Sequence, residues 1–298
     1  MTSMDSSREI LWQPSTEDIT SSRLYEYRQW LTSHHGINFS GYESLWHWSV
    51  DYPEVFWETI ATFFKVKFHS PYSTILSGGP MPETIWFEGA TLNYAEHVFM
   101  GMRGQEVAIL FANEQGVDMS VSVSEMWSEV TKLQRYFKSH GVRRGDRIAG
   151  YLPNIPQATY AFLAATSLGA IWSCCSQDFG VSSVVDRFAQ IEPVLFIAAD
   201  GYYYNGKTHT RLEEIDAVRK SLQSIRDTLL INYTGAIRNE VQPGITIYDT
   251  LLEGGNELPV FEAVPFDHPL WILYSSGTTG APKAITHSHG GCLLEHLK

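Results

Sequence analysis

The sequence predicts an α/β protein built on a parallel sheet and preceded by a mostly helical N-terminal region. From about residue 116, short apolar runs alternate with segments whose apolar residues recur every three or four positions. Repetition of strand, helix and strand implies right-handed crossovers between parallel strands. The first 115 residues lack this alternation. We therefore expect an N-terminal extension over residues 1–115 and an α/β domain over residues 116–298.

The first part carries signals for helices and for one loop. From Pro53 onward, apolar residues fall at three- and four-residue steps, as on a helix that packs against a larger body. His34 and His35 stand just before Gly36, which indicates the solvated end of another helix. The run Ser77-Gly78-Gly79-Pro80 predicts a loop.

The second part can be followed element by element. Met126, Val130 and Phe137 share one helical face, and Gly141 supplies a C-terminal stop. Short apolar runs that end at proline, glycine or polar residues indicate the strands, and the compact apolar segments between them indicate helices. The expected strands are 148–152, 170–174, 194–199, 228–232 and 245–248, and the expected helices lie near 158–168, 182–190 and 212–225.

Composition excludes several classes of function. Hydrophobic residues make up 44% of the 298 residues and charged residues 18%, which is typical of a globular protein. Acidic residues outnumber basic ones by 33 to 21, a net charge of −12, and no run of Lys or Arg occurs. This balance argues against nucleic acid and anionic membranes as partners. It leaves phosphate ligands open, because backbone N–H groups and a single lysine can hold phosphate in an acidic protein.

Cysteine usage and the chain's beginning point to the cytoplasm. The three cysteines, Cys174, Cys175 and Cys292, give neither a disulfide framework nor the spacing of metal ligands. His287 and His289 are two apart and could face one side of a strand, but no acid or cysteine follows at ligand spacing. We therefore expect no metal site among these residues. The first ten residues are polar and show no signal-peptide or transit-peptide pattern.

The most informative stretch is an apolar strand that runs into a loop rich in hydroxyl groups and glycine. Gly277 and Gly280 remove side-chain bulk, so that backbone N–H groups can approach oxygen atoms closely. Lys283 adds a positive charge on a flexible stem. Hydroxyl donors that can surround a phosphate come from Ser275, Ser276, Thr278 and Thr279.

The bare cluster of Ser, Thr and Gly has an alternative explanation as a surface turn between two strands. It is not a Walker loop, because Ala281 and Pro282 separate Gly280 from Lys283. The complete string is more specific than the cluster. Ser275-Ser276-Gly277-Thr278-Thr279-Gly280-Ala281-Pro282-Lys283 resembles the phosphate loop of the adenylate-forming enzymes.

The resemblance extends over most of the chain and favours the acetoacetyl-CoA synthetase branch of the adenylate-forming acyl-CoA synthetases, represented by its N-terminal half. Gln177 and His97 depart from the branch pattern, where Pro and Asn are expected. The matching stretches are Trp86-Phe87 with Gly89-Ala90 and Leu92 to Glu96, Gly145-Asp146-Arg147, Tyr151 to Asn154, Gly169 to Ser173, Asp178-Phe179-Gly180-Val181 with Asp186-Arg187-Phe188, Tyr204-Asn205-Gly206-Lys207, and His287-Ser288-His289-Gly290-Gly291.

This resemblance implies the fold of an adenylate-forming N-terminal domain, so that residues 116–298 would be a partial AMP-binding domain. It also implies ligation of acetoacetate to coenzyme A through an acetoacetyl-adenylate, with ATP, Mg²⁺ and coenzyme A as co-substrates and a role in lipid and ketone-body metabolism. In related enzymes a basic segment at the place of Lys207 binds coenzyme A phosphates. From the residues alone, Lys207 can equally be a solvated lysine in an Asn-Gly turn.

The same resemblance places the catalytic groups, the magnesium ligand and most of the acyl pocket beyond Lys298. Two hypotheses therefore stand beside each other. In the first, the chain represents part of an acetoacetate–CoA ligase whose partners are small molecules. In the second, it is a non-catalytic product that binds nucleotide weakly or binds a partner. We expect residues 1–298 alone to lack ligase activity and to fold poorly, because the parallel sheet would lose cover on an edge and a face.

Overall fold

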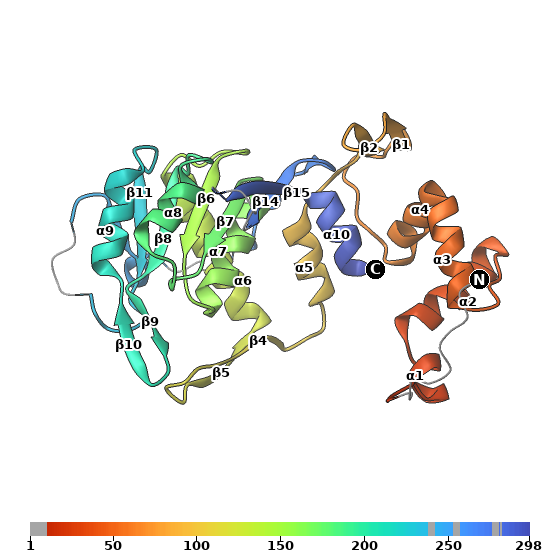
Figure 1. Cartoon of the computed structure of the whole chain (residues 1–298), viewed down its shortest axis with the longest axis horizontal. Coiled ribbons are helices and arrows are strands. Elements are labelled where there is room, and N and C mark those ends of the chain that lie inside the picture. The colour runs from red at the N-terminus through yellow and green to blue at the C-terminus, as the bar shows by residue number, and fades with distance from the viewer. Residues whose placement is uncertain (1–10, 238–241, 253–256, 276–279, 281) are drawn as a thin grey trace. The chain divides into compact units, whose positions relative to one another are not determined.

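The computed structural model describes residues 11–237, 242–252, 257–275, 280 and 282–298 (Figure 1). The backbone forms two compact units. One runs to Val66 and includes Leu297–Lys298, and the other is Lys67–His296. These units are defined by compactness, so the domain boundary expected near residue 115 stays a prediction.

The first unit is helical. Ser22 caps α2, because its side chain accepts a hydrogen bond from the Tyr25 N–H, and Gly36 ends α2 in the left-handed conformation at φ 67°. The predicted helix end at His34 and His35 is therefore confirmed. Pro53 opens α4 at its first turn, where its missing N–H costs nothing. The helices are α1 (Thr16–Thr20), α2 (Arg23–His35), α3 (Tyr42–Asp51) and α4 (Pro53–Phe63).

The second unit is built on a seven-stranded sheet, which confirms the predicted parallel architecture. Neighbouring strands are parallel throughout, except that the last strand pairs antiparallel with β14. In spatial order the strands are β12 (Ile245–Ile247), β11 (Asp227–Ile231), β8 (Leu195–Ala199), β6 (Arg147–Tyr151), β7 (Ile171–Cys175), β14 (Pro269–Ser275) and β15 (Lys283–Ser288).

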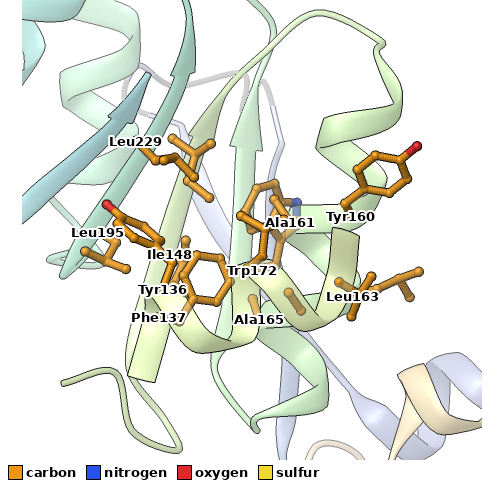
Figure 2. Close-up of a cluster of buried hydrophobic side chains, with 14 of the residues drawn as sticks. Tyr136, Phe137, Ile148, Tyr160, Ala161, Leu163, Ala165, Trp172, Leu195 and Leu229 are labelled. Atoms are coloured by element: carbon orange, nitrogen blue, oxygen red, sulfur yellow. The ribbon is translucent and has the colours of Figure 1, made fainter. Parts of the chain in front are cut away.

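Helices cover both faces of the central strands, whereas Lys283 to His287 of β15 are exposed. On one face α6 (Val123–Ser139) and α7 (Pro156–Ser167) pack against side chains that include Ile148 and Trp172 (Figure 2). On the other face α8 (Val181–Phe188) and α9 (Leu212–Ser221) enclose a second core around Phe196. Burial on both faces explains why the central strands read as continuous apolar runs in the sequence.

Three hairpins and several short elements complete the second unit. The predicted loop Ser77–Pro80 is partly wrong, because Ser77 and Gly78 form the end of β1 and pair with β2. Gly78 permits this turn: its φ is +81°, and a Cβ there would meet the Glu83 carbonyl oxygen at 2.3 Å. The elements are β1 (Thr74–Gly78), β2 (Thr84–Glu88), β3 (Thr91–Leu92), α5 (Tyr94–Gly101), β4 (Val107–Ala112), β5 (Asp118–Ser122), β9 (Gly201–Tyr204), β10 (Lys207–Thr210), η1 (Tyr248–Thr250), β13 (Val264–Pro265) and α10 (His289–Leu297).

Asn93, in the family-matching stretch Leu92 to Glu96, joins segments that are distant in sequence. Its side-chain oxygen caps α5 by accepting the Glu96 N–H. Its amide group lies 3.1 Å from the carbonyl oxygens of Thr166 and Ser167 and 2.9 Å from that of Glu262. The residue is fully buried, so these bonds hold α5 against the end of α7. No helix within the described residues is both long and apolar enough to cross a membrane.

Candidate nucleotide site

The predicted phosphate loop leaves the sheet at the edge where its parallel strands end. β14 runs parallel to β7, and β7 is parallel to β6 in turn. Their carboxyl ends therefore share one edge, and β14 reaches it at Ser275. Ligands of open α/β sheets bind outside this edge. The central loop residues Ser276, Gly277, Thr278 and Thr279 lie outside the described residues.

The two ends of the loop face each other across the β14–β15 pair. Ser275 and Lys283 are direct partners in the antiparallel register, so the pair closes the loop at its base. Gly280 has φ +118°, a conformation that other residues rarely adopt, and an added Cβ would meet no atom within 4 Å. Lys283 is exposed and forms no salt bridge with the carboxylates that the structure describes. The structure thus places Ser275, Gly280 and Lys283 at this sheet edge, and their contact with phosphate stays a prediction.

Contacts with α8 and with the turn that follows it flank the loop on both sides, and sequence reasoning did not find them. The Tyr274 hydroxyl donates to the Arg187 carbonyl oxygen at 2.8 Å. On the other side the Gln190 amide donates to the Pro282 carbonyl oxygen at 3.0 Å. The Arg187 guanidinium lies 4.7 Å from the centre of the Phe179 ring and 5.9 Å from that of Tyr274. Only the Asp186-Arg187-Phe188 stretch of the family resemblance pointed to this helix.

Lys207 lies on a hairpin that starts at the same sheet edge. β8 ends at Ala199 and β9 begins at Gly201, so the hairpin leaves the carboxyl end of a parallel strand. Asn205 and Gly206 both have positive φ, 51° and 70°, which confirms the predicted tight turn. The Gly206 N–H donates to the Glu114 carboxylate at 2.9 Å. Lys207 is exposed, and its coenzyme A role stays a prediction.

The two departures from the branch pattern occupy buried, hydrogen-bonded positions. Gln177 is fully buried, and its amide donates to the Ala199 carbonyl oxygen at 2.6 Å, which joins the ends of β7 and β8. Arg211 donates to the Gln177 carbonyl oxygen at 2.9 Å. The His97 ring accepts the Lys67 N–H at 3.1 Å, and burial lowers the pKa of His97. His97 therefore fits the fold at its position, whereas the buried side-chain oxygen of Gln177 has no hydrogen-bond partner among the described residues.

His287 and His289 do not share one face of a strand, so that expectation is wrong. β15 ends at Ser288, and His289 is the first residue of α10. The His289 side chain is fully buried, and its Nδ1 accepts the Tyr94 N–H at 3.2 Å. Among the residues that the structure describes, no group of three or more His, Cys, Asp or Glu side chains could hold a metal ion.

Comparison with known proteins was made against families, curated sequences and solved structures. A family described as AMP-binding enzyme matches residues 100–297, and one described as acetyl-coenzyme A synthetase N-terminus matches residues 42–98. The acetoacetyl-coenzyme A synthetase of Rhizobium meliloti is 40% identical over 97% of this chain and 44% of its own length. That of Xenopus tropicalis is 36% identical, and a malonamoyl-CoA synthetase of Penicillium aethiopicum is 30% identical.

A solved structure gives the same result for the fold. The acetoacetyl-CoA synthetase from Streptomyces lividans superposes on this chain with a TM-score of 0.92 at 44% identity. The matched region covers 98% of this chain and 45% of the Streptomyces lividans chain. The chain thus spans less than half the length of these relatives. Because the AMP-binding enzyme match covers most of the sequence, this protein belongs to the AMP-binding enzyme family.

Proposed function

We propose that this chain contributes the ATP-phosphate site of an acetoacetate–CoA ligase. The observation that carries the proposal is the loop closed by Ser275 and Lys283 at the carboxyl edge of the sheet, with Lys283 exposed and without a carboxylate partner among the described residues. The names of the relatives from Rhizobium meliloti and Streptomyces lividans support acetoacetate as the acyl group. The reaction would form acetoacetyl-adenylate and pyrophosphate, and the thiol of coenzyme A would then displace AMP.

The chain's own residues would act mainly by positioning and by neutralising charge. Backbone N–H groups and hydroxyls between Ser275 and Gly280 would surround the phosphate oxygens, and Lys283 would offset the charge that builds up on the departing pyrophosphate. Mg²⁺ is a further expected co-substrate, but no step is assigned to it here because the described residues offer no ligand set. Lys207 would contact the phosphates of coenzyme A.

Replacing Lys283 by Ala should weaken ATP binding by about 10- to 150-fold, because a charge-assisted hydrogen bond contributes about 1.5–3 kcal/mol. Titration calorimetry of the chain with ATP and with pyrophosphate measures this change. The matched control is Lys220→Ala, because Lys220 is an exposed lysine that pairs with Asp216 on α9. Equal ATP affinity in the parent chain and in Lys283→Ala would show that the loop does not bind phosphate through this residue.

In a full-length version of the ligase, acetoacetate should be preferred over acetate and butyrate in pyrophosphate exchange. The 3-keto oxygen of acetoacetate can accept a hydrogen bond, and a site built around it would leave a donor unpaired when acetate or butyrate binds. Malonamate is the sharper competitor, because it replaces only the terminal methyl group by an amino group and one relative is named for it. Acid-dependent ATP–pyrophosphate exchange measures the order. A preference for acetate would reject acetoacetate as the acyl substrate, and ATP binding without exchange in the full-length version would reject the ligase function.

A further inference from the structure

We propose that the end of α8 and the turn that follows it form a latch that positions both ends of the phosphate loop, with Gln190 in that turn as the positioning residue for Lys283. The proposal rests on the proposed function for its role in nucleotide binding. The hydrogen bonds of the latch join Tyr274 to Arg187 and Gln190 to Pro282, and the structure describes all four residues.

The latch holds the first end of the loop through Tyr274, the residue before Ser275. The Tyr274 hydroxyl donates to the backbone carbonyl of Arg187, and the ring lies beside the Arg187 guanidinium. The same carbonyl oxygen also accepts the backbone N–H of Gln190 at 3.2 Å, so Tyr274 bonds to the turn that carries Gln190. Burial raises the pKa of Tyr274 to about 12, which keeps the hydroxyl protonated as a donor.

Gln190 holds the second end of the loop through the hydrogen bond from its side-chain amide to the carbonyl oxygen of Pro282, 92 positions later in the sequence. Its amide nitrogen also donates to the carbonyl oxygen of Asp186 in α8 at 2.7 Å, so the Gln190 side chain is anchored to that helix. Pro282 has no N–H, and its carbonyl is its one backbone hydrogen-bonding group. Because Pro282 directly precedes Lys283, this hydrogen bond restricts the position of the Lys283 Cα and hence of its side chain.

The location of Gln190 favours positioning over a role in the core. Its side chain is exposed, so its removal leaves no cavity and should not change the melting temperature. A hydrogen bond that holds Pro282 in place reduces the number of conformations that the adjacent Lys283 must lose when a ligand binds. The expected effect is therefore local, on the loop end and on phosphate affinity.

Limited trypsin digestion of the full chain tests the latch without any ligand. Cleavage after Lys283 releases the peptide Ala284–Lys298, and its rate reports how often the start of β15 opens. Gln190→Ala should raise this rate by about three- to tenfold, the factor that corresponds to one neutral hydrogen bond. Gln190→Glu should do the same, because its carboxylate cannot donate to the Pro282 carbonyl.

The matched control is Gln223→Ala. Gln223 is also exposed near a helix end, and its amide donates only to the nearby Lys220 carbonyl at 2.8 Å. Its loss should leave cleavage at Lys283 unchanged. Parent-like cleavage of Gln190→Ala and Gln190→Glu, or an equal rise in the Gln223 variant, would overturn the latch.

ATP separates this inference from the proposed function. If the loop binds phosphate, saturating ATP should slow cleavage at Lys283, and Gln190→Ala should need about three- to tenfold more ATP for half protection. Absence of ATP protection in the parent chain would reject the nucleotide site, while the ligand-free rates would still decide the latch. Full protection at the same ATP concentration in both proteins would reject the role of Gln190 in nucleotide binding.

Discussion

Replacing Asp200 by Ala should lower the free energy of unfolding of the α/β unit by about 3–5 kcal/mol, because several charge-assisted hydrogen bonds are lost together. Asp200 directly follows β8 and is fully buried. Its carboxylate accepts the N–H groups of Tyr233, Thr234 and Ala236 at 2.9, 2.8 and 2.7 Å. Without the carboxylate, the N–H groups of Thr234 and Ala236 in the turn after β11 lose their partner, whereas the Tyr233 N–H keeps the Ile231 carbonyl oxygen at 3.1 Å.

Urea unfolding of the full chain, followed by far-ultraviolet circular dichroism and tryptophan fluorescence, measures this loss. Glu114→Ala is the matched control, because Glu114 also accepts a backbone N–H, that of Gly206, but from an exposed position. We expect that control to change the stability much less than Asp200→Ala does. A loss of similar size in both variants would show that burial of Asp200 does not set its contribution.

The central sheet could be predicted because local sequence and tertiary environment agree there. The runs around Ile148 and Phe196 are apolar because both faces of the sheet are covered, and glycines such as Gly169 end the intervening helix. The turn at Asn205-Gly206 was predictable for the same reason, since the dipeptide itself favours positive φ. In each case residues close in sequence carry the information.

Contacts between distant residues could not be predicted in this way. Nothing near Asp200 indicates that its carboxylate meets the turn at Tyr233, and nothing near Gln190 indicates Pro282. The two-residue spacing of His287 and His289 suggested one side of a strand, but β15 ends at Ser288, before His289. The phosphate loop was found from its residue types alone, and only its two ends and Gly280 can be compared with the structure.

Lowering the pH from 6.5 should destabilise the protein, and the substitution His289→Asn should remove part of this dependence. His289 is fully buried, and burial, together with the neighbouring His268 and Arg144, lowers its pKa to about 3. Its Nδ1 accepts the Tyr94 N–H, which requires a neutral ring with the proton on Nε2. The ring therefore stays uncharged in the folded protein at pH values where an exposed histidine takes up a proton.

The direction follows from which state binds more protons. Below the unfolded pKa of about 6.5, the unfolded chain protonates this histidine and the folded protein does not, so stability is full above that pH and falls as the pH drops. The loss approaches about 1.4 kcal/mol per pH unit for one such group, until the pH reaches the folded value. Burial also lowers the pKa of His97 and His268, which adds to the loss with the same sign.

The measurement is the free energy of unfolding in urea between pH 4.5 and 7.5 for the parent chain and His289→Asn. The Asn side-chain oxygen can still accept the Tyr94 N–H, so the variant removes the titrating group and keeps an acceptor. Its stability should depend less steeply on pH below 6.5, although the smaller side chain lowers its value at pH 7.5. His47→Asn is the control, because His47 is exposed and solvent reaches its ring in both states. An identical pH dependence in the parent and in His289→Asn would mean that the folded protein binds a proton at this histidine as readily as the unfolded chain does.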